Sequence, residues 1–307
     1  MNEFPVVTVI GSGSLGIMYG SFFEDHLPKE NFYFAEDALH LAKHRDQSYS
    51  LNGKECHFVF KTPEEIHSAP DLIMVAVKAS GLPSATETVK AIAGEDTVII
   101  SVLNGISSEE YIESHIDKGT VIPCIAQKMD ALNKNGAVTS GCFGELCIGI
   151  PKNESYKQKA LDKLIKIFDD MKMPYVLEDD IQRRMWCKWM LNVGVNQVLM
   201  VEDGIFADIQ KAGKKRERMI AAMREVLQLA QAEGIGMTEG DFETYLSIID
   251  HLNPTGMPSM RQDRLAKRKS EVEFFAGTVI RRSEKQGLRA PVNQSLYEEV
   301  KKIESLY

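Results

Sequence analysis

The arrangement of short apolar segments in the first third of the chain constrains the fold more than any other feature. These segments are rich in Val and Ile and end at Ile10, Ala35, Val77 and Leu103. Apolar runs of this length are typical of parallel strands that are buried on both faces. Amphipathic segments lie between them, at Leu15–Asp25 and Leu82–Ile92. The alternation predicts an α/β fold with a Rossmann-type, doubly wound sheet at the N-terminus.

Shorter strand-like segments follow, with Gly, Asn and Ser turns between them. We expect strands around residues 121–125, 137–140 and 145–149, and we expect these strands to extend the sheet in antiparallel fashion. A helix over about 156–172 and a strand at 175–177 would complete this part of the chain.

From Ile181 onward the strand-like pattern disappears and helical periodicity dominates. Helices are expected at Met185–Leu199, Lys211–Glu233, Gly240–Leu252, Val272–Gln286 and Asn293–Glu304. The change follows a short acidic segment at residues 178–180. We therefore predict a dinucleotide-binding domain at 1–180 and an all-helical substrate and catalytic domain at 181–307.

Composition excludes several classes of protein. The formal net charge of −8 argues against a nucleic-acid partner, which favours a basic surface. No apolar run approaches the roughly 18–20 residues that span a bilayer. The N-terminus lacks the pattern of a signal peptide, so we expect a cytoplasmic protein. The His and Cys residues show no metal-ligand spacing, so no metal site is predicted.

A glycine fingerprint, GSGSLG, follows the first predicted strand directly. In such a loop Gly11 allows a tight turn, Gly13 lets the backbone approach a pyrophosphate, and Gly16 permits close packing of helix and strand. The N–H groups of the following helix favour a phosphate. We therefore predict cofactor contacts from Gly11, Ser12, Gly13, Ser14, Leu15 and Gly16.

The residues after the second strand bear on the choice of cofactor. An acidic side chain there binds the adenosine ribose hydroxyls and repels a 2′-phosphate. Glu36 and Asp37 occupy this position, which favours NAD(H). The alternative is that both acids cap a helix and face solvent. Lys43 and Arg45 follow closely and could bend back to bind a 2′-phosphate.

Two further turns follow predicted strands of the sheet. Lys78 lies in the first turn, and Asn104 and Gly105 form the second. Ligands of doubly wound sheets bind at the carboxyl ends of the strands. Lys78 and Asn104 are therefore candidates for contact with the cofactor.

A row of polar residues stands out in the helical part of the chain. Lys188, Asn192 and Asn196 are spaced four apart, so a helix places them on one face. An ammonium can donate a proton, and the amides can donate and accept hydrogen bonds, which suits a carbonyl or hydroxy-acid substrate. The alternative is a lysine that reaches solvent beside surface asparagines.

Together these segments resemble the ketopantoate reductase family (2-dehydropantoate 2-reductase) over nearly the whole chain. The resemblance rests on the order and spacing of GSGSLG, VK at Lys78, NG at Asn104, WCKWMLNVGVN around Lys188, SMRQD around Ser259, SEVEFFAG around Glu271 and APVNQSLYEEVK. It implies that Lys188 is the general acid and that Glu271 orients the substrate. It also implies that Asn192, Asn196 and Ser259 bind the substrate, and that Asn104 lies beside the cofactor.

The resemblance implies NADP(H) as cofactor, whereas Glu36 and Asp37 replace the arginine that the family usually carries and make NAD(H) plausible. Ser107 and Ala276 also depart from the family pattern, which leaves the substrate open. The expected partner is a small keto acid, with no nucleic acid and no membrane, and a homodimer stays open as the assembly.

The sequence thus favours NAD(P)H-dependent reduction of a small branched 2-keto acid, with 2-dehydropantoate to (R)-pantoate as the leading reaction. One alternative is a related dehydrogenase that acts on another 2- or 3-hydroxy acid. Another is a dinucleotide-sensing protein without turnover, which would need the glycine loop but not Lys188 and Glu271 together.

Overall fold

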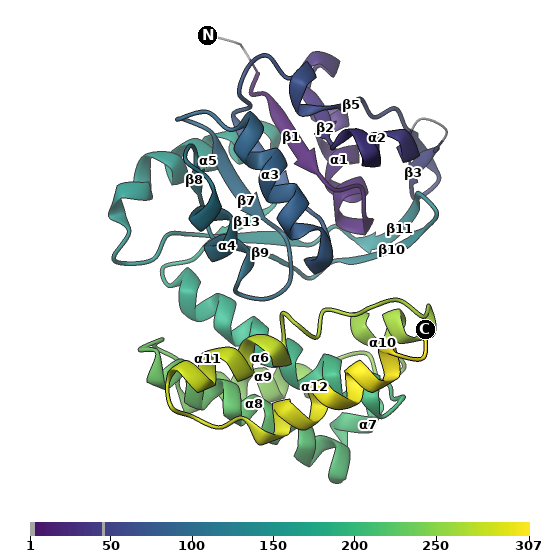
Figure 1. Cartoon of the computed structure of the whole chain (residues 1–307), viewed down its shortest axis with the longest axis vertical. Coiled ribbons are helices and arrows are strands. Elements are labelled where there is room, and N and C mark those ends of the chain that lie inside the picture. The colour runs from purple at the N-terminus through teal and green to yellow at the C-terminus, as the bar shows by residue number, and fades with distance from the viewer. Residues whose placement is uncertain (1–3, 45–46) are drawn as a thin grey trace. The chain divides into compact units, whose positions relative to one another are not determined.

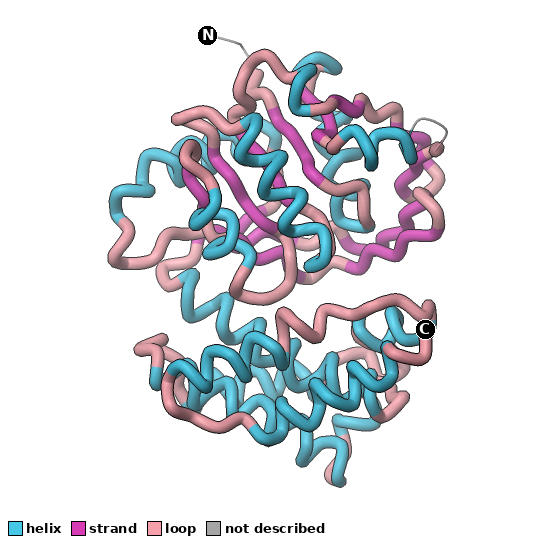
Figure 2. Tube along the Cα trace, viewed as in Figure 1, coloured by secondary structure: helices cyan, strands magenta, loops and turns pink. Residues whose placement is uncertain are grey.

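The computed structural model describes residues 4–44 and 47–307. The chain divides into two compact units. The N-terminal unit contains residues 1–104 and 108–181, and the helical unit contains residues 105–107 and 182–307. Within the described residues, strands occur only in the N-terminal unit, as the magenta segments of Figure 2 show.

The N-terminal unit is built on a six-stranded sheet with the order β5-β2-β1-β6-β7-β8. Every pairing in this sheet is parallel, which confirms the predicted Rossmann-type sheet (Figure 1). Every residue of β1, β2, β6 and β7 is buried, as the apolar runs predicted. The strands are β1 Val7–Ile10, β2 Phe32–Ala35, β5 Phe60–Lys61, β6 Leu72–Val75, β7 Val98–Ser101 and β8 Thr120–Val121.

The prediction that the later strands extend this sheet in antiparallel fashion is wrong. Pro123 divides the expected strand at 121–125, because proline has no N–H for a strand ladder. The part before it, β8, pairs parallel with β7 at the edge of the sheet. The part after it belongs to a separate three-stranded sheet in the order β13-β12-β9. Its strands are β9 Cys124–Gln127, β12 Glu145–Ile148 and β13 Tyr175–Leu177.

A further four-stranded sheet has the order β10-β11-β3-β4. It joins a hairpin from residues 130–142 to a short hairpin from residues 49–56, through a parallel pairing of β11 with β3. The strands are β3 Tyr49–Leu51, β4 Lys54–Cys56, β10 Asp130–Lys134 and β11 Ala137–Cys142.

Helices complete the N-terminal unit. In α5 the buried residues Leu161, Leu164 and Phe168 recur at helical spacing, so one apolar face packs into the core. The helices are α1 Ser14–His26, α2 Ala38–His44, α3 Leu82–Ile92, α4 Ser108–His115 and α5 Gln158–Met171. The 3₁₀ turns are η1 Lys29–Asn31, η2 Pro63–Glu65, η3 Ala79–Gly81 and η4 Ser155–Lys157.

A carboxyl group is buried in the first turn of α4. Glu109 is 7% exposed, and its Oε2 accepts a hydrogen bond from Ser108 Oγ at 2.8 Å. Ser101 on β7 donates in turn to Ser108 at 2.8 Å. Glu109 Oε1 has no hydrogen-bond partner within the described part of the chain. Burial raises the pKa of Glu109 from the ordinary 4.5 to about 7.

This burial predicts a pH-dependent stability. Because folding raises the pKa of Glu109, its carboxyl group contributes fully to the free energy of unfolding below pH 4.5. This contribution is lost as the pH rises through 7. We expect Glu109→Gln, which cannot ionise, to raise the free energy of unfolding at pH 8 by about 2–3 kcal/mol. Urea unfolding at pH 5 and pH 8 measures the change. The exposed Glu87→Gln is the control, and an unaltered pH dependence in Glu109→Gln would contradict the assignment.

The helices of the helical unit begin with α6, whose first residue, Ile181, still belongs to the N-terminal unit. The helices are α6 Ile181–Val201, α7 Ala207–Gln210, α8 Lys214–Ala232, α9 Glu239–Asp250, α10 Ser259–Leu265, α11 Ala276–Lys285 and α12 Pro291–Glu304. α12 packs against α8 and α11, and α11 also contacts α8. None of the helices in the described ranges is long and apolar enough to cross a membrane.

The helix expected at residues 272–286 begins later than predicted. Residues 271–275 form turns, and α11 starts at Ala276. The buried side chain of Gln197 on α6 accepts a hydrogen bond from the Ala276 N–H at 3.0 Å. This partner satisfies an N–H group that the first turn of a helix leaves unpaired. The start of α11 is therefore stabilised by a side chain that is distant in sequence, and local periodicity cannot predict where this helix begins.

Candidate active site

The glycine loop joins β1 to α1 in the geometry that the fingerprint predicts. Gly11 has a φ of +100°, a conformation that side chains rarely adopt. A Cβ atom on Gly11 would lie 2.7 Å from Val77 Cγ1, and one on Gly16 would lie 1.9 Å from the Gly11 oxygen. Both positions therefore require glycine, so that the turn can form and α1 can pack closely on β1.

The remaining residues of the loop are more exposed than Gly11 and Gly16. Gly13 is exposed, and Ser12, Ser14 and Leu15 are half-buried. The nearest atom to a Cβ on Gly13 would be the Ala76 oxygen at 3.8 Å, so the space above Gly13 is open. Among the residues that the structure describes, no side chain caps α1, and the first turn of this helix carries no acidic residue. Such a helix start fits a pyrophosphate, which needs exposed N–H groups and no competing negative charge.

The structure separates the roles of the two acids after β2. Asp37 caps α2: its Oδ1 accepts from the His40 N–H at 2.9 Å, and its Oδ2 accepts from Ser84 Oγ at 2.9 Å. The pKa of Asp37 is lowered to about 2, with its burial opposing the shift and the His40 and Ser84 hydrogen bonds producing it. Glu36 is a different case, because its side chain is 11% exposed and lies 3.8 Å from His44 Nε2. Of the two acids, Glu36 is therefore the candidate for the adenosine ribose.

Lys78 and Asn104 lie in the turns after β6 and β7. Lys78 is exposed and precedes η3, where its carbonyl oxygen accepts from the Gly81 N–H at 2.8 Å. Asn104 is half-buried and precedes Gly105, whose φ is +111°. The Lys43 side chain and Arg45, the other candidates for a 2′-phosphate contact, lie outside the described residues.

On α6 the predicted row of polar residues lies along one face of the helix. Lys188 is half-buried, and Asn192 and Asn196 are 9% and 5% exposed. Asn196 Nδ2 donates to Asn192 Oδ1 at 3.3 Å. Asn196 Oδ1 accepts from Ser259 Oγ at 3.0 Å and from the Met260 N–H at 3.1 Å. The structure therefore brings Asn192, Asn196 and Ser259 together, and Asn196 supports the first turn of α10.

Glu271 lies in the turn before α11 and is half-buried. The preceding residue, Ser270, donates to Glu304 on α12 through its N–H at 2.7 Å and its Oγ at 2.6 Å. On the other side of Glu271, the Phe274 oxygen accepts from Trp189 Nε1 at 2.9 Å. Trp189 is the residue after Lys188, so the turn that carries Glu271 is attached to the turn of α6 that carries Lys188.

Sequence reasoning missed the buried amide network behind this face. Gln197 Nε2 donates to Asn293 Oδ1 at 3.2 Å, and Asn293 Nδ2 donates to Glu225 at 2.7 Å. Glu225 also accepts from the Val292 and Asn293 N–H groups, at 2.8 and 2.9 Å, at the start of α12. The one signal in the sequence is a glutamine within the apolar segment that follows Asn196.

Comparison with known families decides the family of this chain. The family model described as "Ketopantoate reductase PanE/ApbA" matches residues 7–152, and the model of its C-terminal part matches residues 180–304. The chain belongs to the ketopantoate reductase family. This confirms the resemblance drawn from the motifs. It also confirms the predicted enzyme class, a nicotinamide-dependent oxidoreductase that acts on CH–OH groups.

Members of the ketopantoate reductase family are similar to this chain over almost its whole length. A 2-dehydropantoate 2-reductase of Streptococcus pyogenes serotype M3 (strain ATCC BAA-595 / MGAS315) is 22% identical over 292 residues, 93% of this chain and 94% of the relative. A dimeric ketopantoate reductase from Staphylococcus aureus has a TM-score of 0.75 at 22% identity, covering 98% of this chain and 99% of the other.

The same fold also occurs in a solved structure with a different name. D-mandelate dehydrogenase, in a ternary structure with NADH and anilino(oxo)acetate, has a TM-score of 0.81 at 22% identity. The alignment covers 98% of this chain and 99% of that one. These similarities to solved structures establish the fold.

Proposed function

We propose that this protein reduces a small branched 2-keto acid, 2-dehydropantoate, to pantoate. The observation that carries the proposal is the polar face of α6, on which Lys188 precedes two buried asparagines, one of them bonded to Ser259. A bound nicotinamide supplies the hydride that reduces the keto carbon. Lys188 donates a proton to the carbonyl oxygen, so that the carbonyl becomes a hydroxyl group, and its charge stabilises the developing alkoxide.

The hydrogen bonds of the helical unit divide the remaining roles. Because Asn196 Oδ1 already accepts from Ser259 and Met260, Asn196 acts by holding its neighbours. Asn192 and the exposed Ser259 then contact the substrate, with the Ser259 hydroxyl toward its carboxylate. Glu271 orients the substrate hydroxyl and Lys188, and Ser270 and Trp189 fix the turn that carries it.

The N-terminal unit supplies the cofactor site. Gly11, Gly13 and Gly16 shape the loop for the pyrophosphate, and Asn104 and Lys78 contribute from the neighbouring turns. Glu36 accepts the hydroxyl groups of the adenosine ribose and repels a 2′-phosphate. We therefore propose NADH as the preferred cofactor.

The cofactor preference is directly measurable. We expect the Kd for NADH to be lower than that for NADPH by about tenfold or more, because a phosphate beside the Glu36 carboxylate costs on the order of 1.4 kcal/mol. Fluorescence titration with both cofactors measures the two constants. A Kd for NADPH that is tenfold lower than that for NADH would contradict the role of Glu36.

The test of the reaction is an assay of NADH and NADPH oxidation at 340 nm against a panel of 2-keto acids. Ketopantoate should give the highest kcat/KM. The second candidate is a dehydrogenase of another 2-hydroxy acid. Two observations favour it: Glu36 lies where an NADH ribose would bind, and the similar D-mandelate dehydrogenase structure contains NADH. Faster turnover of an aromatic 2-keto acid would select this candidate, and no turnover with any keto acid would overturn both.

We further propose that this protein forms a homodimer, because a similar ketopantoate reductase is dimeric. Light scattering measures the oligomeric state.

A further inference from the structure

A chain of polar side chains connects the glycine loop to Glu36 within the N-terminal unit. The Ser12 side chain hydrogen-bonds to the phenol group of Tyr49 on β3. The Tyr49 hydroxyl hydrogen-bonds to Nδ1 of His44, the last residue of α2. His44 Nε2 lies 3.8 Å from Glu36 Oε1. Four segments from residues 12–49 therefore meet at the end of β2, where the adenosine ribose is expected.

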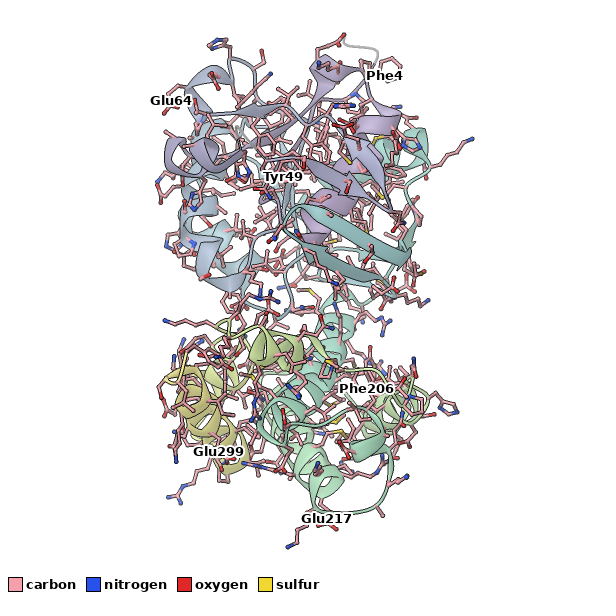
Figure 3. The ribbon with its side chains drawn as sticks, turned by 90° about the vertical axis from the view of Figure 1, so that its right-hand side faces the viewer. Phe4, Tyr49, Glu64, Phe206, Glu217 and Glu299 are labelled. Carbon is pink, nitrogen blue, oxygen red and sulfur yellow. The ribbon has the colours of Figure 1, made fainter. Side chains whose placement is uncertain are left out.

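The middle of this chain of side chains is buried and well packed. Tyr49 is 4% exposed and lies among other side chains of the N-terminal unit (Figure 3). Its ring lies 5.6 Å from those of Phe58 and Phe60. The His44 imidazole stacks on Phe60, with 4.5 Å between ring centroids and 6° between planes. These contacts restrict both rings, and a polar interaction is stronger in such an apolar setting than in water.

Each contact between these side chains can be assigned one donor and one acceptor. Burial raises the pKa of Tyr49, with the charge of Glu36 adding to the effect, so Tyr49 remains a hydrogen-bond donor near neutral pH. The Tyr49 hydroxyl then donates to His44 Nδ1, which assigns the proton of a neutral imidazole to Nε2. That N–H faces the Glu36 carboxylate. A carboxylate has about four acceptor positions, so Glu36 can be oriented by His44 and still accept from ribose hydroxyls.

We propose that His44 and Tyr49 are positioning residues for cofactor selection: through their contacts they hold the Glu36 carboxylate toward the adenosine ribose and couple it to Ser12 of the glycine loop. The inference rests on the nicotinamide cofactor proposed above. It extends that proposal, because cofactor preference then depends on residues that need not touch the cofactor. Asp37 cannot replace Glu36 in this role, since it is engaged in capping α2.

The test compares Kd values for NADH and NADPH in the full chain, in four single variants and in the double variant Tyr49→Phe/His44→Leu. Tyr49→Phe keeps the ring and removes only the hydroxyl. His44→Leu removes both contacts, whereas His44→Gln retains an amide N–H near the position of Nε2. The control is His57→Gln, because the His57 side chain is exposed in the same unit. Thermal unfolding of each variant shows whether the fold is intact.

We expect Tyr49→Phe and His44→Leu each to raise the Kd for NADH about five- to tenfold, the scale of one net hydrogen bond. The Kd for NADPH should change less than about twofold, because the 2′-phosphate gains nothing from a well-oriented carboxylate. At saturating cofactor, kcat should be nearly unchanged. His44→Gln should stay close to wild type. The double variant should be no worse than the worse single variant, since the two residues act as a unit.

Two results would overturn the inference. One is an equal rise of both Kd values in Tyr49→Phe, which indicates a purely structural role. The other is an unchanged ratio of the two Kd values in His44→Leu. The reaction is judged separately: a protein whose ratio shifts as expected but which reduces no keto acid supports the inference and refutes the proposed function. A wild-type preference for NADPH that both variants leave unchanged refutes the inference together with the proposed role of Glu36.

Discussion

Replacement of Lys188 by alanine should lower kcat by about 10²-fold or more, the usual scale for a positioned general acid. Without the ammonium, neither a proton nor a positive charge meets the developing alkoxide. The helical unit should remain folded, because Lys188 is only half-buried and the Trp189 and Asn196 contacts of α6 persist. The cofactor Kd should be nearly unchanged. Steady-state kinetics with saturating cofactor and substrate measure the loss.

Two further lysine variants sharpen this test. Lys188→Arg keeps the charge but should lose almost as much activity, because a guanidinium does not release its proton near neutral pH. Lys285→Ala, at the exposed end of α11 in the same unit, is the control and should retain wild-type kcat. If Lys188→Ala kept half of the wild-type turnover, Lys188 would be an ordinary surface lysine and the mechanism would need another acid.

Replacement of Gly16 by alanine should damage both stability and cofactor binding. The new Cβ would lie 1.9 Å from the Gly11 oxygen, so backbone must move at the junction of β1 and α1. We expect a loss of about 2–4 kcal/mol in the free energy of unfolding. The same movement displaces the N–H groups that face the pyrophosphate. Thermal unfolding and NADH titration measure the two effects.

Two other glycines separate these effects. At Gly13 the nearest atom to an added Cβ would be 3.8 Å away, so Gly13→Ala should keep wild-type stability yet weaken NADH binding by about tenfold, because the methyl group occupies the pyrophosphate site. At Gly236 no atom of the described residues would lie within 4 Å of an added Cβ. Gly236→Ala should therefore match wild type in both measurements. Wild-type stability in Gly16→Ala would show that the loop adapts more easily than its geometry indicates.

The central sheet could be predicted from sequence because its signal is local. A parallel strand that is buried on both faces needs a continuous apolar run, and β1, β2, β6 and β7 each have one. The division into three sheets could not be predicted in the same way. It depends on which distant strands pair, as when β11 joins β3 across more than eighty residues. The short β3 and β4 have too few residues to show a period.

The candidate site could be predicted from sequence only in part, because some of its contacts join residues that are distant in sequence. The spacing of Lys188, Asn192 and Asn196 is visible on one helix, whereas Ser259 and Glu271 were found through the family resemblance. The contact of Asn196 with Ser259 joins residues 63 positions apart, and periodicity does not predict such a contact. Nothing in the local sequence pattern marks Tyr49 or His44 either, because their proposed role depends on contacts that form where β3 and α2 approach the end of β2.

The double use of Asn196 has a consequence for how this enzyme can change. Its amide oxygen supports both Ser259 and the first turn of α10, so a substitution that alters substrate choice there also removes a helix cap, a loss of about 1 kcal/mol. Within the described residues, Asn192 accepts a hydrogen bond from Asn196 and supports no helix start. Laboratory evolution toward new keto acids should therefore accumulate changes at position 192 first, and reach position 196 only in backgrounds that are already stabilised.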